Sequence, residues 1–334
     1  ARHIEYNIAF DEPAYSVHPS GNAEFRTTNL RFVYSSMTTP ASTYDYDLQS
    51  RERVLKKRQP VPGYDPTLYQ SDRVTAKAVD GTEIPISLVW RRDRKKNGPQ
   101  PLMLYGYGSY GISIDPGFSQ TRVSLLDRGV VFAVAHIRGG GDLGHSWYEA
   151  GKMAKKDTTF TDFITCAEEL IARGWTTPQQ LAIEGGSAGG LLMGVVVNRR
   201  PELFKAVIAE VPFVDVINTM LDETLPLTVG EFIEWGNPKL DEQYAWMRAY
   251  SPYDNLRQGA FPAMLVRTGL NDTQVSYWEP SKYVAKIRSL KTDANPLLMK
   301  INLEVGHGGA SGRFDSLREI AEDDVFLLVE LGLE

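Results

Sequence analysis

One stretch decides the fold of this chain: Leu181-Ala182-Ile183-Glu184-Gly185-Gly186-Ser187-Ala188-Gly189-Gly190-Leu191-Leu192-Met193-Gly194. An apolar run typical of a buried strand enters Gly185-Gly186-Ser187-Ala188-Gly189, and a predicted helix follows at once. A G-x-S-x-G motif between a strand and a helix is typical of the nucleophile turn of α/β-hydrolases. The glycines fit because so tight a turn has no room for a Cβ beside the serine. We therefore predict that Ser187 is a nucleophile. The alternative is a glycine-rich turn that merely contains a serine.

The general base is selected by chain order, because α/β-hydrolases present the serine, then the acid, then the histidine. One histidine follows Ser187 among the five in the chain, which are His3, His18, His136, His145 and His307. His307 lies in the glycine-rich loop 304–309, just after a predicted strand at 297–303. A neutral imidazole there can take the serine proton. The alternative is a solvent-exposed loop histidine.

The acid should follow the preceding strand, which is predicted at 263–268. Asp272 is the only carboxylate in the next loop, 269–275. Its predicted role is to fix the tautomer of the imidazole and to stabilise the imidazolium. Asp254 and Asp293 are poorer candidates because neither directly follows a strand. The alternative for Asp272 is an ordinary turn aspartate.

Two glycine-rich loops, 106–111 and 139–144, follow predicted strands and match the G-x-G-x-x-G pattern of dinucleotide-binding folds. Pro116 prevents a helix from opening after the first, and the second lacks a clear acid at the end of a next strand about 20 residues on. We interpret loop 106–111 as the source of one oxyanion donor, with the Ala188 backbone N–H as the other. The chain has no H-E-x-x-H motif and no Cys/His cluster, so no metal and no cofactor are predicted.

The chain divides into two parts that differ in their pattern of predicted strands and helices. Residues 1–62 hold short β-prone runs at 30–36, 43–48 and 53–57 and no helical period. Residues 63–334 open with a hairpin whose two runs, 73–79 and 83–90, are joined by Asp80-Gly81. Apolar strands then alternate with amphipathic helices. The strands are predicted at 102–105, 130–137, 180–184, 206–210, 263–268 and 297–303, and the helices at 158–173, 188–198, 280–290 and 316–331. This pattern predicts an α/β-hydrolase fold, a mostly parallel sheet with helices on both faces.

Composition fits a soluble globular protein. The 334 residues are 42% hydrophobic and 23% charged, and the net charge of −6 disfavours nucleic acid as a partner. The single cysteine, Cys166, lies at helical spacing among apolar residues and is predicted to be a buried thiol, which suits a reducing compartment. No apolar run of about 18 residues and no signal-type stretch is present, so we expect a cytoplasmic protein without a membrane anchor. The chain starts without Met, so we expect it to begin inside a longer polypeptide.

Several motifs together resemble the prolyl oligopeptidase family of serine peptidases, and its oligopeptidase B branch in particular. They are Leu104–Gly111, His136–Gly141, Gly185–Gly194, Pro212–Val216, Gly230–Phe232, Glu234–Pro238, Tyr277–Pro280 and Gly306-His307. The resemblance spans essentially the whole chain in the same order. Residues 31–48 resemble the closing blade of the family's β-propeller, so the fold is expected to begin with a short all-β segment of this kind. One blade cannot close a propeller, so the missing propeller portion is an expected partner.

The resemblance implies roles for further residues. It makes the Tyr107 hydroxyl the second oxyanion donor, beside the Ala188 N–H. It implies that peptides are the substrates and that Glu231 pairs with a substrate Arg or Lys. Asp115 becomes a candidate for a second basic side chain, and the remaining substrate-binding positions are Tyr110, Gln274 and Val275.

The sequence also departs from the branch. Ile233 and Gly117 stand where a second acid often follows Glu231 and Asp115, and Gln274 stands where an arginine often follows the catalytic aspartate. These departures predict a weaker preference for basic residues.

We therefore predict a serine oligopeptidase that hydrolyses short basic peptides after Arg or Lys through an acyl-enzyme. One alternative is a serine esterase or lipase-like enzyme on the same fold, against which Glu231 argues, because an apolar acyl pocket has no use for a buried carboxylate. The other is a non-catalytic binding module, against which the intact Ser187, Asp272 and His307 argue.

Overall fold

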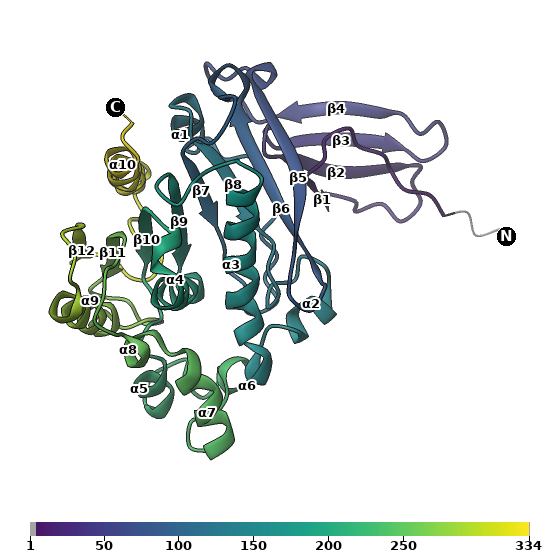
Figure 1. Ribbon diagram of the computed structural model, residues 1–334. Helices are drawn as coiled ribbons and strands as arrows, with labels where there is room; N and C mark the ends of the chain where they lie inside the picture. The colour runs from purple at the N-terminus through teal and green to yellow at the C-terminus, as the bar shows by residue number, and fades with distance from the viewer. Residues whose placement is uncertain (1–4, 334) are drawn as a thin grey trace.

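The computed structural model describes residues 5–333; Ala1–Ile4 and Glu334, which include the start of the 1–62 segment, lie outside the described residues. The described chain builds two sheets. A four-stranded sheet has the order β1-β2-β3-β4, and an eight-stranded sheet has the order β12-β11-β10-β9-β7-β8-β6-β5. Figure 1 shows the four-stranded sheet projecting from the side of the molecule beside β5 and β6.

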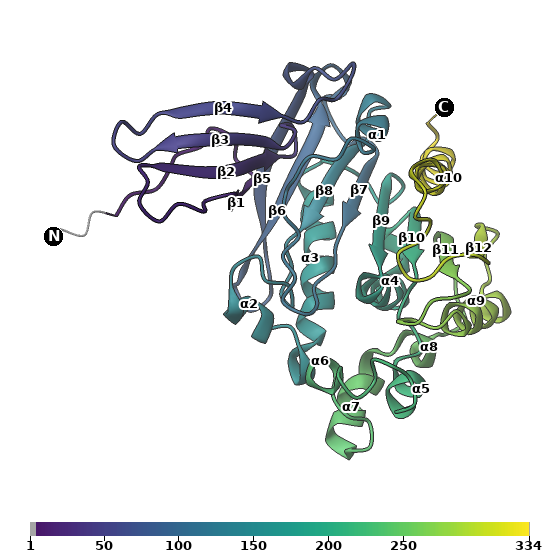
Figure 2. The same cartoon turned by 180° about the vertical axis from the view of Figure 1, so that it is seen from behind.

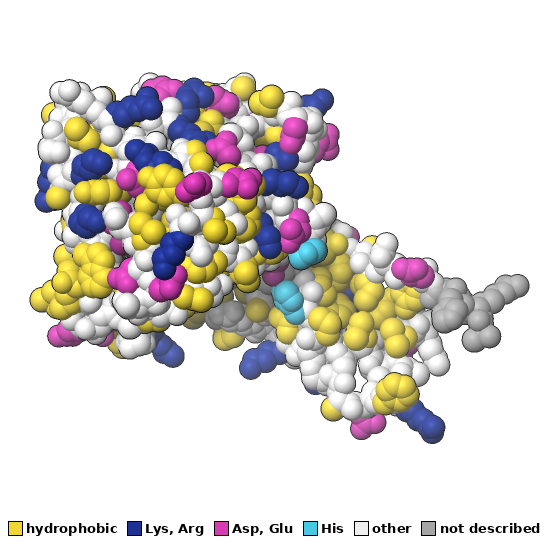
Figure 3. Space-filling view, turned by 90° about the horizontal axis from the view of Figure 1, so that it is seen from below, with side chains coloured by type: hydrophobic (Ala, Val, Ile, Leu, Met, Phe, Trp, Pro, Cys, Tyr) yellow, Lys and Arg dark blue, Asp and Glu magenta, His cyan; other side chains and the backbone are white. Residues whose placement is uncertain are grey.

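The four-stranded sheet is an antiparallel meander. Its strands are β1 (Tyr15–Pro19), β2 (Asn29–Ser36), β3 (Ser42–Asp47) and β4 (Arg53–Arg58). The sequence predicted the last three and missed β1, which is short, ends in proline and exists through its pairing with β2. Its small core consists of Phe32, Tyr34 and Tyr46. Every residue of β4 is exposed, and Figure 3 shows apolar side chains gathered over this lobe, on the right of the view.

The eight-stranded sheet is mostly parallel, as predicted. Parallel strands form its centre and one edge: β7 (Leu102–Tyr105), β8 (Val131–Ala135), β9 (Leu181–Gly186), β10 (Ala206–Glu210), β11 (Ala263–Gly269) and β12 (Leu297–Asn302). The other edge is an antiparallel hairpin, β5 (Tyr69–Lys77) and β6 (Glu83–Arg91), and β6 also pairs antiparallel with β8. This sheet with its covering helices confirms the predicted α/β-hydrolase fold.

The helices enclose this sheet from both faces (Figures 1 and 2). The four long predicted helices are present as α3 (Asp157–Ala172), α4 (Ala188–Arg199), α9 (Trp278–Leu290) and α10 (Arg313–Glu330). The short ones were not predicted, because one to three turns carry too weak a period to recognise. They are α1 (Val123–Asp127), α2 (His145–Glu149), α5 (Val216–Leu221), α6 (Phe232–Trp235), α7 (Asp241–Tyr250) and α8 (Pro252–Asn255). Short 3₁₀ turns are η1 (Pro66–Leu68), η2 (Arg92–Arg94), η3 (Met153–Lys155) and η4 (Pro201–Leu203).

Each face of the sheet has its own apolar core. The larger core lies under α3, α4 and α9, and the smaller one contains the buried side chains of α1 and α10. Cys166 of α3 is fully buried in the larger core, and burial raises the pKa of its thiol. Within residues 5–333, no helix combines the length and apolar character that crossing a membrane requires.

We predict that the two sheets unfold as separate units. Phe32→Ala removes a ring that is 2% exposed from the small core, a change that typically costs about 3–5 kcal/mol. Hydrogen exchange should then lose protection in β1–β4 and keep it in β7–β11. Leu55→Ala, at a position 45% exposed on β4, is the matched control and should change little. Equal loss of protection in both sheets would show one cooperative unit instead.

Candidate active site

The three predicted triad residues gather at one edge of the large sheet. Ser187 directly follows β9, Asp272 lies three residues after β11, and His307 lies in the loop after β12. Strands β9, β10, β11 and β12 are consecutive and parallel, so their carboxyl ends share this edge. The topology therefore brings together residues that are 120 positions apart in the sequence.

The turn at Ser187 has the strained backbone expected of a nucleophile turn. Ser187 adopts φ +58° and ψ −116°, a conformation that residues with a Cβ rarely take. A Cβ on Gly185 would lie 2.5 Å from the Gly189 carbonyl oxygen, and one on Gly189 would lie 2.9 Å from that of Gly106. The two glycines that flank the serine are therefore required by backbone contact, as the motif predicted.

Asp272 and His307 form a hydrogen-bonded pair. The Nδ1 atom of His307 lies 2.8 Å from Oδ2 of Asp272, which is buried. The other oxygen, Oδ1, accepts the backbone N–H groups of Gln274 and Val275 at 2.8 and 2.9 Å. Both carboxylate oxygens are thus held, and Nδ1 of the ring is occupied, which leaves Nε2 for a proton from the serine.

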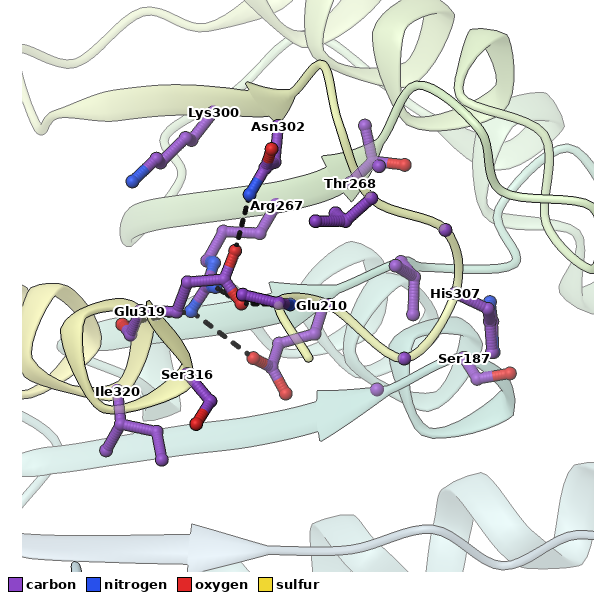
Figure 4. Close-up of a pocket in the computed structure, with 18 residues that line it drawn as sticks. Ser187, Glu210, Arg267, Thr268, Lys300, Asn302, His307, Ser316, Glu319 and Ile320 are labelled. Atoms are coloured by element: carbon purple, nitrogen blue, oxygen red, sulfur yellow. Dashed lines mark hydrogen bonds and ion pairs between the residues drawn. The ribbon is translucent and has the colours of Figure 1, made fainter. Parts of the chain in front are cut away.

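Ser187 and His307 lie next to each other at one end of a cavity of about 330 Å³ (Figure 4). Among residues 5–333 no hydrogen bond joins the two side chains; in triads this contact often tightens only with substrate bound. The far end of the cavity holds Arg267 and Glu319. The Glu319 carboxylate accepts the Ala310 N–H at 2.9 Å and pairs with Arg267 at 3.2 Å, so α10 anchors the loop that carries His307.

A second cavity, of about 240 Å³, opens on the other side of Ser187 and collects most of the predicted substrate positions. Its lining includes Tyr107, Tyr110, Ala188, Glu231, Gln274 and Val275. Burial, together with the nearby charges of Glu231 and Glu234, raises the pKa of Tyr107 to about 12. Its phenol therefore keeps its proton at neutral pH and can donate a hydrogen bond toward the serine.

Glu231 stands at the start of α6 with both carboxylate oxygens engaged. Tyr110 donates its hydroxyl to Oε1 at 3.0 Å, and Trp235 donates its indole N–H to Oε2 at 2.7 Å. Burial raises the pKa of Glu231, and these two hydrogen bonds oppose that rise. Within the described part of the chain, no lysine or arginine forms an ion pair with this carboxylate.

Asp115 lies apart from this group. It is exposed, its Oδ2 atom contacts Nε2 of His18 on β1 at 3.0 Å, and it borders another cavity, beside Arg122. Ile233, in the position of a second acid, is 72% exposed and lines neither cavity beside Ser187.

Comparison with known proteins shows the family of this chain. The profile described as "Prolyl oligopeptidase family" matches residues 116–334, and the one described as "Prolyl oligopeptidase, N-terminal beta-propeller domain" matches residues 2–59. The chain belongs to the prolyl oligopeptidase family. The predicted resemblance is therefore confirmed, and the four-stranded sheet falls within the residues that match the propeller.

Relatives of known name cover nearly the whole chain. It is 53% identical to dipeptidyl aminopeptidase BI of Pseudoxanthomonas mexicana over 98% of its length and 45% of that protein. It is 46% identical to protease 2 of Moraxella lacunata, over 98% of this chain and 48% of that protein. The chain spans about half the length of the curated relatives that it matches.

Two solved structures of the family have the same fold. Oligopeptidase B from Leishmania major is 47% identical with a TM-score of 0.92, over 97% of this chain and 46% of that one. Oligopeptidase B from Trypanosoma brucei, in a closed form with covalently bound antipain, is 48% identical with a TM-score of 0.92, over 98% of this chain and 47% of that one.

The second glycine-rich loop, 139–144, packs directly against the first, 106–111. A Cβ on Gly139 would lie 2.1 Å from the Gly108 carbonyl oxygen, and the Gly111 N–H donates to the Gly139 carbonyl at 3.0 Å. The two loops pack backbone against backbone, which explains both G-x-G-x-x-G matches by close contact.

A second Ser–His–Asp series lies inside the protein. Ser87 Oγ is 2.8 Å from Nε2 of His136, and Nδ1 of His136 is 2.8 Å from Oδ1 of Asp142. Ser87 is fully buried, so no substrate reaches its hydroxyl. Asp142 also accepts the Ile114 N–H at 3.1 Å, so this series ties the segment just after the first glycine-rich loop to the second loop.

Sequence reasoning missed Lys156 and Tyr148 and assigned no role to Glu234 and Trp235. Lys156 follows Lys155 and has the pattern of a solvated charge pair, yet it is 1% exposed. Glu234 and Trp235 belong to a recognised motif, but only the packing of α6 shows that both side chains point inward.

We predict that Ser187 alone reacts with a fluorophosphonate probe. Ser187→Ala should abolish labelling, read by intact mass, while circular dichroism stays unchanged. The matched control is Ser87→Ala, which removes the serine of the buried series and should still label. Full labelling of Ser187→Ala would refute the assignment of the nucleophile.

We predict that Tyr107→Phe lowers kcat about 10²- to 10³-fold with little change in KM, the typical effect of losing one oxyanion donor. The measurement is steady-state hydrolysis of a chromogenic peptide amide. An unchanged kcat would remove Tyr107 from the oxyanion site and leave the triad assignment intact.

Proposed function

We propose that this chain carries the active site of a serine peptidase that cleaves peptides after Arg or Lys. In this scheme Ser187 Oγ attacks the scissile carbonyl while His307 takes its proton. The Tyr107 hydroxyl and the Ala188 N–H donate to the oxyanion, and Asp272 stabilises the imidazolium. His307 then protonates the leaving amine, and water hydrolyses the acyl-enzyme by the reverse sequence of proton transfers.

The proposal for basic specificity rests on one observation. The Glu231 carboxylate borders the same cavity as Ser187 and has hydrogen-bond donors but no cationic partner among the described residues. A partly desolvated carboxylate without a counter-charge favours a cation that enters the cavity. A substrate guanidinium supplies that charge and can form a bidentate pair, whereas an ammonium makes a single point contact.

A second candidate is the removal of dipeptides from free N-termini. It is favoured by the 53% identity to a protein named dipeptidyl aminopeptidase BI and by the small cavity, whose carboxylate, Glu231, has no ion-pair partner within residues 5–333. There the substrate α-ammonium would take the place of the guanidinium. Matched dipeptide amides with free and acetylated N-termini distinguish the two, because an endopeptidase accepts the acetylated one.

The esterase alternative has less support, because an apolar acyl pocket gains nothing from Glu231. Comparison of benzoyl-arginine amide with a short acyl ester tests it directly. Preference for the ester that persists in Glu231→Gln would favour an esterase.

We also propose that residues 1–62 are part of a propeller and residues 63–334 are the catalytic unit. The exposed strand β4 and the propeller match over residues 2–59 support a propeller portion as partner. A reducing, cytoplasmic location is proposed from the single cysteine, which is buried.

We predict that kcat/KM follows the order Arg, Lys, Phe for matched substrates and that Glu231→Gln lowers the Arg-to-Phe ratio at least tenfold, as loss of one partner of a desolvated charge pair commonly does. Ile233→Glu is the matched control: it adds a carboxylate two residues away, on a side chain exposed to solvent, and should leave the ratio unchanged. A parent that prefers Phe, or an unchanged ratio in Glu231→Gln, contradicts the proposal.

We predict that basic specificity is lost in acid. Burial raises the pKa of Glu231 above its ordinary value, so the carboxylate is charged above that pKa and becomes neutral as the pH falls through it. The Arg-to-Phe ratio should therefore drop as the pH falls toward and below the pKa, and in Glu231→Gln it should stay flat. A ratio independent of pH in the parent would exclude Glu231 as the determinant.

A further inference from the structure

A buried lysine lies beneath the loop that carries Tyr107 and Tyr110. Lys156 stands between η3 and α3 and is 1% exposed. Its ammonium donates hydrogen bonds to the Gly108 carbonyl oxygen and to Ser109 Oγ, each at 2.7 Å. Removing an ammonium from water is unfavourable unless its charge is compensated and its protons are bonded. Because burying this ammonium costs desolvation free energy, we expect the lysine to have a specific role at this position.

The compensating charge comes from Glu234. Its Oε1 atom is 3.8 Å from the Lys156 ammonium and accepts the Tyr110 backbone N–H at 3.0 Å. Its Oε2 atom accepts the Tyr148 hydroxyl at 2.7 Å, and the residue is 1% exposed. The lysine therefore holds Gly108 and Ser109, and the glutamate holds Tyr110.

The loop needs such anchors because its backbone is strained. Gly108 has φ +71° and Tyr110 has φ +59°, and a residue with a Cβ keeps a positive φ only where its surroundings hold it there. The side chain of Tyr110 then reaches Glu231, and Tyr107 directly precedes the anchored residues Gly108–Tyr110. The loop conformation thus sets the position of one tyrosine beside Ser187 and of the other beside Glu231.

We propose that Lys156 and Glu234 are positioning residues, a buried pair that fixes loop 106–111 so that Tyr107 can stabilise the oxyanion. This inference rests on the proposed function, because it requires Tyr107 to act on the reaction. Neither residue lines the cavities beside Ser187, so the pair acts through the loop and not on the substrate.

The pair also predicts a pH dependence. The charged group that faces Lys156 is Glu234 of α6. Glu234 in turn lies near two titratable side chains, Tyr148 of α2 and Tyr250 of α7, and Lys152 donates to the Tyr148 hydroxyl. Burial lowers the pKa of Lys156 to about 8, and Glu234 opposes that shift. The ammonium is charged below this pKa and loses its proton as the pH rises through it. Loop anchoring should therefore weaken on the alkaline side.

The test is a set of variants made in the protein as the cell produces it. Lys156→Met and Glu234→Gln should each lower kcat about 10- to 100-fold on an arginine amide, the scale of a misplaced catalytic group, with KM little changed. Lys291→Met is the matched control. Lys291 is also largely buried and donates to the Asp293 and Asn295 carbonyls, but it lies at the carboxyl end of α9, before β12, and lines neither cavity beside Ser187. Its loss should lower the Tm and leave kcat unchanged.

Two readouts separate positioning from mere stability. In a Tyr107→Phe background, Lys156→Met should lower kcat by a much smaller factor than in the wild type, because the Tyr107 hydroxyl that Lys156 positions is already absent. In the wild type, kcat should fall as the pH rises above about 8. The pH profile of folded Lys156→Met should lack this fall. The inference would be overturned if Lys156→Met lowered kcat by the same factor in both backgrounds, or if its alkaline fall in kcat matched that of the wild type.

The outcomes are distinct from failure of the proposed function. A wild type that neither labels at Ser187 nor hydrolyses peptides refutes that function. An active wild type with a kcat within twofold in folded Lys156→Met refutes only the positioning role. If Lys156→Met does not fold, Glu234→Gln decides, because it keeps the size and an acceptor for Tyr110 and changes only the charge.

Discussion

This site depends on close contact between glycine backbones at the carboxyl edge of the large sheet. Gly185 and Gly189 leave no room for a Cβ around Ser187, and Gly139 touches the carbonyl of Gly108. These contacts pack the loop of Tyr107 against the turn at Ser187 on one side and against the second glycine-rich loop on the other. The sheet supplies the rest, because parallel strands present Ser187, Asp272 and His307 at one edge.

Charges around this edge are arranged unequally. Glu210, Glu319 and Asp323 share Arg267, and Glu234 lies beside Lys156, so each of these acids has a basic side chain within ion-pair distance. Glu231, by contrast, receives only neutral donors among residues 5–333, from Tyr110 and Trp235. We propose that this carboxylate, beside the candidate nucleophile, receives a positively charged substrate group, and the difference between Glu231 and the neighbouring acids supports that proposal.

The residues of the candidate triad could be picked out from the sequence because the patterns that mark them are local. A strand, a glycine turn and a helix specify Ser187, and chain order then leaves one histidine and one loop aspartate. The long helices and nearly all strands were likewise predictable from period and length. What could not be predicted depends on tertiary packing: β1 exists through its pairing with β2, Asp115 faces His18, and Lys156 is buried although its neighbour Lys155 is exposed. The roles of Tyr107 and Glu231 came from resemblance to a family and not from any local pattern.

The central claim is that Ser187 is acylated by a substrate whose arginine side chain lies against Glu231. Rapid quenching of the reaction with a benzoyl-arginine ester, followed by intact mass and peptide mapping, measures this directly. We predict an acyl group on Ser187 that forms and decays at least as fast as turnover, and that accumulates far less when the ester carries a neutral side chain. An acyl group on another residue, or turnover with no acylation of Ser187, would contradict it.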